Sequence, residues 1–110
     1  MPSPARIRST IVTITDPPAN LKELAVIHKA LADPTRLRIL QRLSDGEGTV
    51  GDLMRHVDLS QPLVSWHIRR LRTAGLIETR RAGRETICSL GRETLARFHE
   101  QESSLLGLGR

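Results

Sequence analysis

The chain of 110 residues is poor in cysteine and in aromatic residues, with one Cys, one Trp, one Phe and no Tyr. A single cysteine excludes an internal disulfide framework and fits a reducing compartment. The lack of aromatic side chains predicts one small aliphatic core of modest stability. No apolar run approaches the roughly 18 residues that cross a bilayer, and the start lacks the apolar segment of a secretory signal. We therefore expect a cytoplasmic protein that contacts no membrane.

The sequence also lacks the usual signs of catalysis. It contains no pairing of a nucleophile with a base, no glycine-rich phosphate loop and no paired-carboxylate motif. A chain of this length is also too small to enclose a substrate pocket and still dimerise through other surfaces. We do not expect an enzyme.

Arginine is in excess, and the excess is local. The formal net charge is +5, from 17 basic and 12 acidic residues. Six arginines lie between residues 69 and 84 with Glu78 as the only acid there, whereas the rest of the chain has eleven bases and eleven acids. Such a concentration predicts a surface that binds a polyanion rather than an ordinary solvated face.

Periodicity and capping residues divide the chain into an N-terminal arm, residues 1–19, and a domain, residues 20–110. Four helices are predicted, and their expected caps are Asn20, Asp33, Thr49 and Ser60. Residues 78–90 then form a two-stranded ribbon that turns at Gly83, and a last helix starts near Arg92. The predicted order is α-α-α-α-β-β-α, a mainly helical fold with a small β-hairpin.

The second predicted helix is short and amphipathic. Its core face is expected to consist of Leu37, Leu40 and Leu43. Its arginines, Arg36 among them, are expected to point away from that face.

Residues 60–74 form the most informative predicted helix. On a helical wheel Val64, Ile68 and Leu71 point inward, and His67 lies at the edge of this buried stripe. The outward positions are Pro62, Ser65, Trp66, Arg69, Arg70 and Thr73. Gly75 ends the helix. A short basic helix that is capped and exposed on one side suits the major groove of DNA.

The first and last helices have more apolar surface than one small domain covers. In the first helix Val26, Ile27 and Ala30 widen the apolar face, and in the last helix a stripe runs from Leu95 to Leu106. We therefore assign both helices to a two-fold interface between identical chains.

Four segments together resemble a known family. Residues 30–40 read ALADPTRLRIL, residues 59–61 LSQ, residues 65–68 SWHI and residues 71–77 LRTAGLI. These motifs in this order closely resemble the ArsR-type (ArsR/SmtB) winged helix-turn-helix regulators over about residues 21–100. The resemblance implies a homodimeric bacterial repressor, which usually leaves its operator when a metal ion or another signal is sensed. It also implies that helix 60–74 enters the major groove and that ribbon 78–90 is the wing.

The sensing half departs from the metal-responsive members of that family. Some metal-responsive members carry Cys-x-Cys in the third helix, but residues 50–54 of this chain contain no thiol. Other members carry Asp-x-His at the start of the last helix, where residues 92–94 of this chain read RET. His28, His99 and Glu102 are the remaining metal candidates, across the first and last helices, but without a dedicated spacing. We expect no metal or other cofactor, and a buried structural thiol at Cys88.

The candidate DNA contacts fall into three groups. Ser60, which caps the helix, and Gln61 lie where the helix N-terminus meets DNA, and Pro62 and Ser65 project from the same face. Arg69 and Arg70 are better placed for phosphates than for bases. Arg81 and Arg84, at the ribbon tip, reach the flanking minor groove or the backbone.

Two candidate contacts have alternative interpretations. The wheel places His67 at the margin of the core, whereas the resemblance makes it a DNA contact. Trp66 either touches a thymine methyl group and a sugar edge or packs beneath the wing.

The favoured function is a sequence-specific homodimeric repressor of an inverted-repeat operator in double-stranded DNA. The alternative is a winged-helix module that binds protein, or binds nucleic acid without sequence choice. The arginine cluster favours the first.

Overall fold

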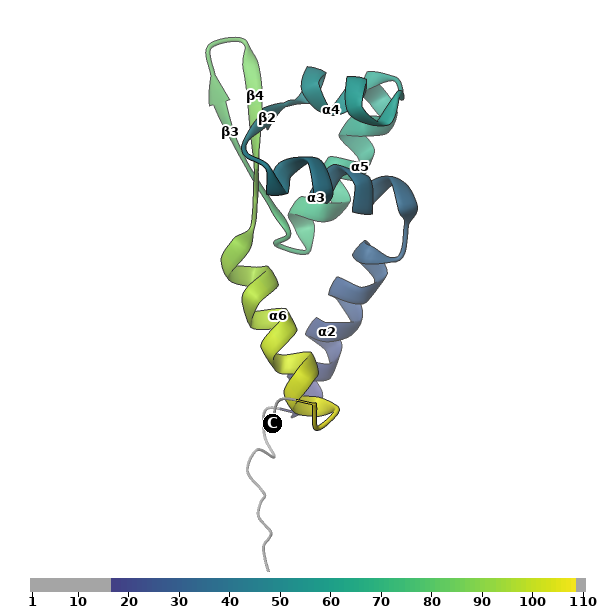
Figure 1. Ribbon diagram of the computed structural model, residues 1–110, viewed down its shortest axis with the longest axis vertical. Coiled ribbons are helices and arrows are strands. Elements are labelled where there is room, and N and C mark those ends of the chain that lie inside the picture. The colour runs from purple at the N-terminus through teal and green to yellow at the C-terminus, as the bar shows by residue number, and fades with distance from the viewer. Residues whose placement is uncertain (1–16, 109–110) are drawn as a thin grey trace, which may run out of the picture.

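The computed structural model describes residues 17–108, with side chains from Leu21 onward. In chain order the elements are α2 (Pro17–Leu31), α3 (Pro34–Ser44), β2 (Gly48–Thr49), α4 (Val50–Val57), α5 (Gln61–Thr73), β3 (Ile77–Ala82), β4 (Glu85–Leu90) and α6 (Arg92–Leu105) (Figure 1). The predicted winged helix-turn-helix is confirmed. No helix in the described part of the chain is long and apolar enough to span a membrane.

Two details at the level of elements differ from the prediction. Strand β2 pairs antiparallel with β4, so the sheet has three strands in the order β2-β4-β3. Two residues are too few for an alternating pattern, so this strand has no sequence signal. Helix α2 begins at Pro17, so the predicted cap at Asn20 is wrong. Proline fits the first turn of a helix because its missing N–H is not needed there. The rest of the predicted arm, residues 1–16, lies outside the described residues.

The starts of α3 and α4 follow the predicted caps. A carboxylate oxygen of Asp33 accepts a hydrogen bond from the Arg36 backbone N–H at 3.0 Å, and Pro34 occupies the first turn. At α4, the Thr49 hydroxyl accepts from the backbone N–H of Asp52 at 3.0 Å, while the Asp52 carboxylate accepts from that of Thr49 at 2.9 Å. These reciprocal bonds form a capping box and fix the start of the helix-turn-helix.

The core is aliphatic, as predicted, but the inner face of α3 is rotated from the predicted one. Leu37 is 50% exposed, and Ile39 is fully buried. Arg36 is only 6% exposed, so the prediction that it points away from the core is wrong. The cause is tertiary: the guanidinium meets backbone carbonyls at the end of α2, which satisfy its donors.

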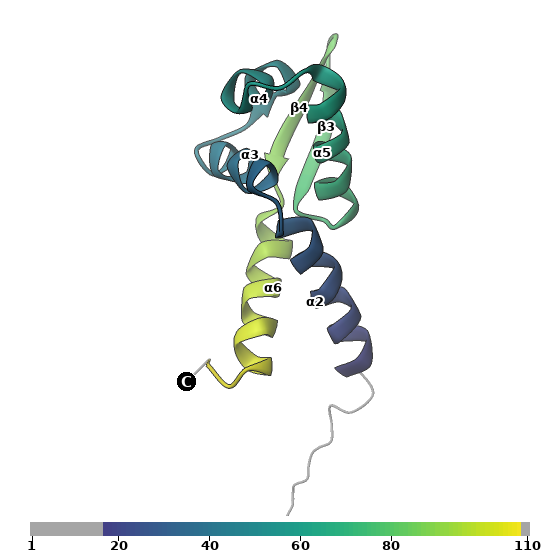
Figure 2. The same cartoon turned by 90° about the vertical axis from the view of Figure 1, so that its right-hand side faces the viewer.

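The elements separate into two ends of the molecule. The pair α4 and α5 and the hairpin of β3 and β4 lie at one end, and α2 and α6 extend side by side from the other (Figures 1 and 2). Gly91 joins these parts: its N–H donates to the Leu76 carbonyl at 2.8 Å, and a Cβ there would collide with the Gly75 carbonyl oxygen. This close approach fixes where α6 leaves the sheet.

Candidate nucleic-acid interface

The N-cap residue of helix α5 is Ser60, which is exposed and has an extended conformation with φ −68° and ψ 159°. The predicted cap position is confirmed, but the Ser60 hydroxyl makes no capping hydrogen bond. The backbone carbonyl of Ser60 accepts the first hydrogen bond of the helix, from the Val64 N–H at 3.0 Å. The hydroxyl is therefore not engaged by its own helix, and it lies beside the exposed side chains of Gln61 and Pro62.

The outer face of α5 largely follows the wheel. Val64, Ile68 and Leu71 are buried, Arg69 and Arg70 are exposed, and Ser65 is half-buried on the side of the hairpin. Among the described residues Arg69 and Arg70 form no ion pair with a carboxylate. This face therefore presents positive charge that no neighbouring acid neutralises.

The hairpin turns where the sequence predicts. Gly83 has φ +65°, the left-handed conformation that glycine adopts without strain, and Arg84 follows it at the tip. Arg81 and Arg84 are both exposed, and Arg81 donates to the Thr86 hydroxyl at 3.4 Å. Each of these arginines presents its charge away from the core.

Arg80 differs from its neighbours in the arginine cluster. Its guanidinium nitrogens lie 2.6 and 3.0 Å from the two carboxylate oxygens of Glu47, in the loop before β2. This hydrogen bonding and the charge of Arg80 hold the pKa of Glu47 below its usual value. The pair secures the hairpin to the body of the domain, so Arg80 contributes little net charge to the interface.

A small cleft of about 190 Å³ lies between α5 and the inner side of the hairpin. Its polar lining consists of Ser65, Arg69, Arg72, Thr79 and Thr86. Arg72 donates to the Thr79 hydroxyl at 3.3 Å across the cleft. Guanidinium and hydroxyl donors, without a carboxylate in the lining, suit a phosphate oxygen.

Sequence reasoning did not single out Arg72, Thr79 and Thr86 as interface residues. A signal for Thr79 exists, because it lies two residues after the buried Ile77 and therefore shares the inner face of β3. The position of Thr86 depends on the register of β4, in which Thr86 is opposite Arg81. That register was not predicted from the sequence.

The side chain of Trp66 is 44% exposed and lies between two arginines. The guanidinium carbons of Arg36 and Arg70 are 5.7 and 5.4 Å from its ring centre. Trp66 also lines a groove with Val26 and Ala30 of α2. The alternative of packing beneath the wing is therefore wrong, because Trp66 faces α2.

His67 is 8% exposed, which agrees with the margin of the core and leaves little surface for a DNA base. Its Nδ1 lies 3.2 Å from Nη1 of Arg36 and 3.9 Å from the Asp33 carboxylate. Burial and, to a smaller extent, the charge of Arg36 lower the pKa of His67, against the opposite effect of Asp33. We therefore remove His67 from the candidate contacts.

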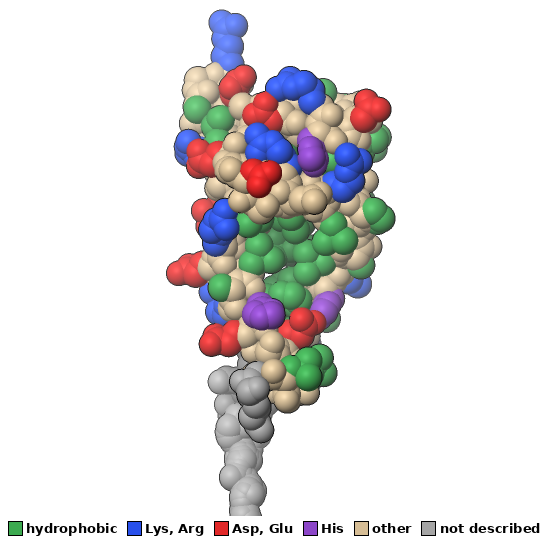
Figure 3. Space-filling model, in the orientation of Figure 1, with side chains coloured by type: hydrophobic (Ala, Val, Ile, Leu, Met, Phe, Trp, Pro, Cys, Tyr) green, Lys and Arg blue, Asp and Glu red, His purple; other side chains and the backbone are tan. Residues whose placement is uncertain are grey.

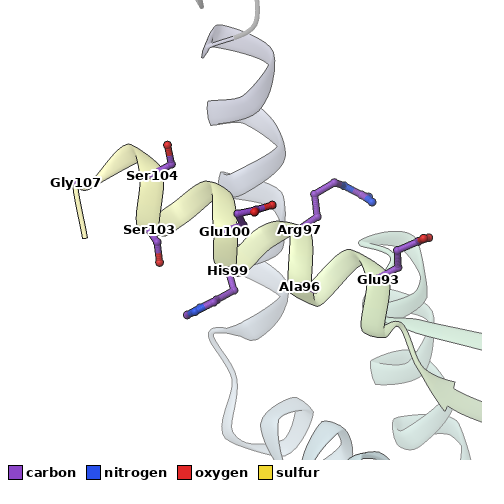
Figure 4. A pocket seen from close by; sticks show the side chains of 8 residues that line it. All are labelled: Glu93, Ala96, Arg97, His99, Glu100, Ser103, Ser104 and Gly107. Carbon is purple, nitrogen blue, oxygen red and sulfur yellow. The ribbon is translucent and has the colours of Figure 1, made fainter. Parts of the chain in front are cut away.

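The three metal candidates are not gathered in one place. His28 Nε2 lies 2.8 Å from a carboxylate oxygen of Glu102, and its ring meets Phe98 edge to face. His99 lines a separate surface pocket along α6, which Glu100 lines as well (Figure 4). Among residues 17–108, no three His, Cys, Asp or Glu side chains are placed to hold a metal ion.

Cys88 is fully buried in β4, as predicted. Burial raises the pKa of its thiol, and the nearby positive charge of Arg72 offsets only part of this effect. A thiol in this position is a structural one.

Comparisons with known proteins agree with this architecture. Residues 33–79 match the family model described as bacterial regulatory protein, arsR family. The chain is 43% identical over 74 residues to the arsenical resistance operon repressor of Staphylococcus xylosus, covering 67% of this chain and 71% of that one. It is 38% identical over 69 residues to the transcriptional repressor SdpR of Bacillus subtilis, covering 63% and 77%.

A solved structure extends the similarity to three dimensions. HlyU from Vibrio cholerae superposes with a TM-score of 0.65 at 36% identity, over 78% of this chain and 94% of that one. The arsR family consists of DNA-binding regulators rather than enzymes. The sequence identity, the matched motifs and the fold agree: this chain belongs to the arsR family of bacterial regulatory proteins and is a DNA-binding transcriptional repressor.

Proposed function

We propose that two copies of this repressor bind an inverted-repeat operator, with α5 of each copy in the major groove and the hairpin against the flanking backbone or minor groove. One arrangement carries this proposal: arginines without an ion-pair partner among the described residues lie on the outer face of α5 and at the hairpin tip, and that tip is far from α2 and α6 (Figure 1). Because DNA repels carboxylates and attracts arginines, the surface formed by α5 and the hairpin is the one suited to the duplex. The protein would act in the cytoplasm, where it meets such DNA.

The apolar surface of α2 and α6 supports the dimer. Val26 and Leu21 of α2 are 51% and 48% exposed, and Leu105 and Leu106 at the end of α6 are 56% and 62% exposed. Hydrophobic side chains also line the hollow between the two helices in Figure 3. Burial of these side chains against a second copy would stabilise both chains and place the two α5 helices symmetrically.

Within each half-site the side chains divide by chemistry. Ser60 and Gln61, with Pro62 and Ser65, lie at the end of α5 that would approach base edges. Arg69, Arg70, Arg81 and Arg84 supply charge to phosphates, and the cleft of Arg72, Thr79 and Thr86 adds donors between them. Two-fold symmetry then predicts half-sites about one helical turn, or about 34 Å, apart.

We also propose that DNA binding requires no resident metal or cofactor. The support is geometric: His99 lies apart from the His28–Glu102 pair, which leaves two ligands where a closed site needs more. Affinity for DNA measured with and without a strong chelator is expected to be equal, and a loss on chelation would contradict this.

The central experiment is selection of duplexes from a random-sequence library by the wild-type protein. We expect an inverted repeat to be enriched, and light scattering to show a dimer both free and on this enriched duplex. Random duplex should compete poorly with it. Equal competition would instead support a module without sequence choice, and a stable monomer in both states would refute the dimer.

A further inference from the structure

Arg36 of α3 is a buried cation without an ion-pair partner within 4.0 Å among the described residues. Its Nε donates to the Ala30 carbonyl at 2.7 Å, and its Nη2 donates to the Lys29 carbonyl at 3.3 Å. Both carbonyls belong to the last turn of α2, and the Lys29 carbonyl also accepts from the Ala32 backbone N–H at 3.3 Å. The negative end of the helix dipole therefore stabilises the guanidinium.

The third hydrogen bond of Arg36 reaches α5. Nη1 lies 3.2 Å from Nδ1 of His67, and both side chains are buried. A guanidinium only donates, so Nδ1 must accept, and the imidazole is neutral with its proton on Nε2. One side chain from α3 thus connects the end of α2 to the middle of the helix that carries the proposed DNA contacts.

The surroundings hold this connection in one geometry. Asp33 accepts from the Arg36 backbone N–H at 3.0 Å and places its carboxylate 3.9 Å from His67 Nδ1. Trp66 covers the outer side, with its ring centre 4.9 Å from that of His67 and 5.7 Å from the Arg36 guanidinium carbon. The hydrogen bond is shielded from water, so its loss would not be fully replaced by solvent.

We propose that Arg36 and His67 are positioning residues for DNA binding. Their hydrogen bond holds α5 at a fixed angle to the last turn of α2. The affinity for the operator depends on this hydrogen bond, although neither side chain reaches DNA. The inference rests on the proposed function, because α2 is the helix assigned to the dimer interface. A shift of α2 at that interface is then transmitted to α5 through the carbonyls that Arg36 binds. The affinity of the DNA-binding face is in this way set by the position of the dimerisation helix.

The test compares two substitutions of His67 on the enriched duplex, at a temperature where light scattering and circular dichroism show folded dimers. His67→Gln supplies an amide oxygen that can accept from Arg36, whereas His67→Leu fills the space without an acceptor. We expect the Leu variant to bind about tenfold more weakly or worse, the loss that about 1.4 kcal/mol represents, and the Gln variant to bind within about threefold of wild type.

Salt dependence separates positioning from direct contact. If His67 only positions α5, the slope of log affinity against log salt is unchanged in the Leu variant, since no phosphate contact is lost. A shallower slope, or an equal loss in both variants, would overturn the proposal in favour of a direct contact. Wild-type affinity in the Leu variant would overturn it as well. Failure of wild type itself to enrich a duplex would instead refute the proposed function.

Arg36→Lys provides a second approach that does not depend on His67 variants alone. A lysine ammonium cannot make the three divergent bonds of the guanidinium, so we expect a similar loss of affinity. The matched control is Arg38→Lys on the same helix, because Arg38 is exposed and donates to the His56 carbonyl at 2.8 Å instead. In an Arg36→Met background, which has no donor at this position, His67→Leu should cost little more, since the shared bond is already absent. Additive losses would overturn the connection.

Discussion

Replacement of both hairpin arginines, Arg81→Ala with Arg84→Ala, tests the contribution of the wing to DNA binding. Both side chains are exposed at the turn around Gly83, and neither pairs with a carboxylate among the described residues. Their removal should leave the fold intact, because the register from Ile77–Leu90 to Ala82–Glu85 depends on backbone bonds. The expected effect is therefore electrostatic, and equal for all DNA sequences.

The magnitude follows from the four arginines of each copy that the proposed function assigns to phosphates. With Arg69, Arg70, Arg81 and Arg84 each neutralising one phosphate, a dimer neutralises about eight, which predicts a slope of about −7 for log affinity against log salt. The variant retains about four contacts and a slope of about −4. Between 50 and 200 mM salt, wild-type affinity should then fall by about 10⁴ and that of the variant by about 10².

Fluorescence anisotropy with a labelled duplex, titrated at several salt concentrations, measures both slopes. The matched control is Arg80→Ala with Glu47→Ala, which removes one charge of each sign from the bonded pair. This control should keep the wild-type slope. An unchanged slope in the Arg81 and Arg84 variant would remove the wing from the DNA-binding face, and a reduced slope in the control would show that Arg80 reaches DNA.

Three further outcomes are expected. Gly91→Ala should lower the thermal unfolding midpoint, because its Cβ would collide with the Gly75 carbonyl oxygen; an unchanged midpoint would contradict this close approach. Burial raises the pKa of the Cys88 thiol, so a thiol-reactive dye should label it slowly in the native protein and rapidly in denaturant, and fast native labelling would show that it is accessible. Burial also lowers the pKa of His67 in the folded state below its usual 6.5, so the unfolded chain takes up the proton at higher pH. Stability should be complete above about pH 6.5 and decline below it, and His67→Gln should reduce this decline; an identical decline would refute the assignment.

The elements that the sequence predicts well are those with local physical causes. The caps at Asp33 and Thr49 form bonds within three residues, and Gly83 supplies a positive φ at a turn. Short-range interactions of this kind depend little on the rest of the molecule. The helical wheel also placed Arg69 and Arg70 outside, because the alternation of apolar and polar residues in α5 is regular.

The features that the sequence does not predict depend on tertiary neighbours. Strand β2 exists only because β4 passes beside it, with Gly48 opposite Cys88. Arg36 is buried because carbonyls at the end of α2 accept its hydrogen bonds, and no local pattern in α3 predicts this. The orientation of Trp66 likewise depends on α2, which lies more than thirty residues away in sequence.

The burial of Arg36 also separates stability from orientation. Removing a charge from water is costly, and well-packed apolar replacements of buried polar groups are often neutral or stabilising. An apolar core would, however, allow α5 to slide against α2, whereas three directional bonds allow one geometry. A combined Arg36→Met and His67→Leu variant should therefore keep most of its thermal stability and still lose affinity for the enriched duplex. Loss of both in proportion would mean that the network serves folding alone.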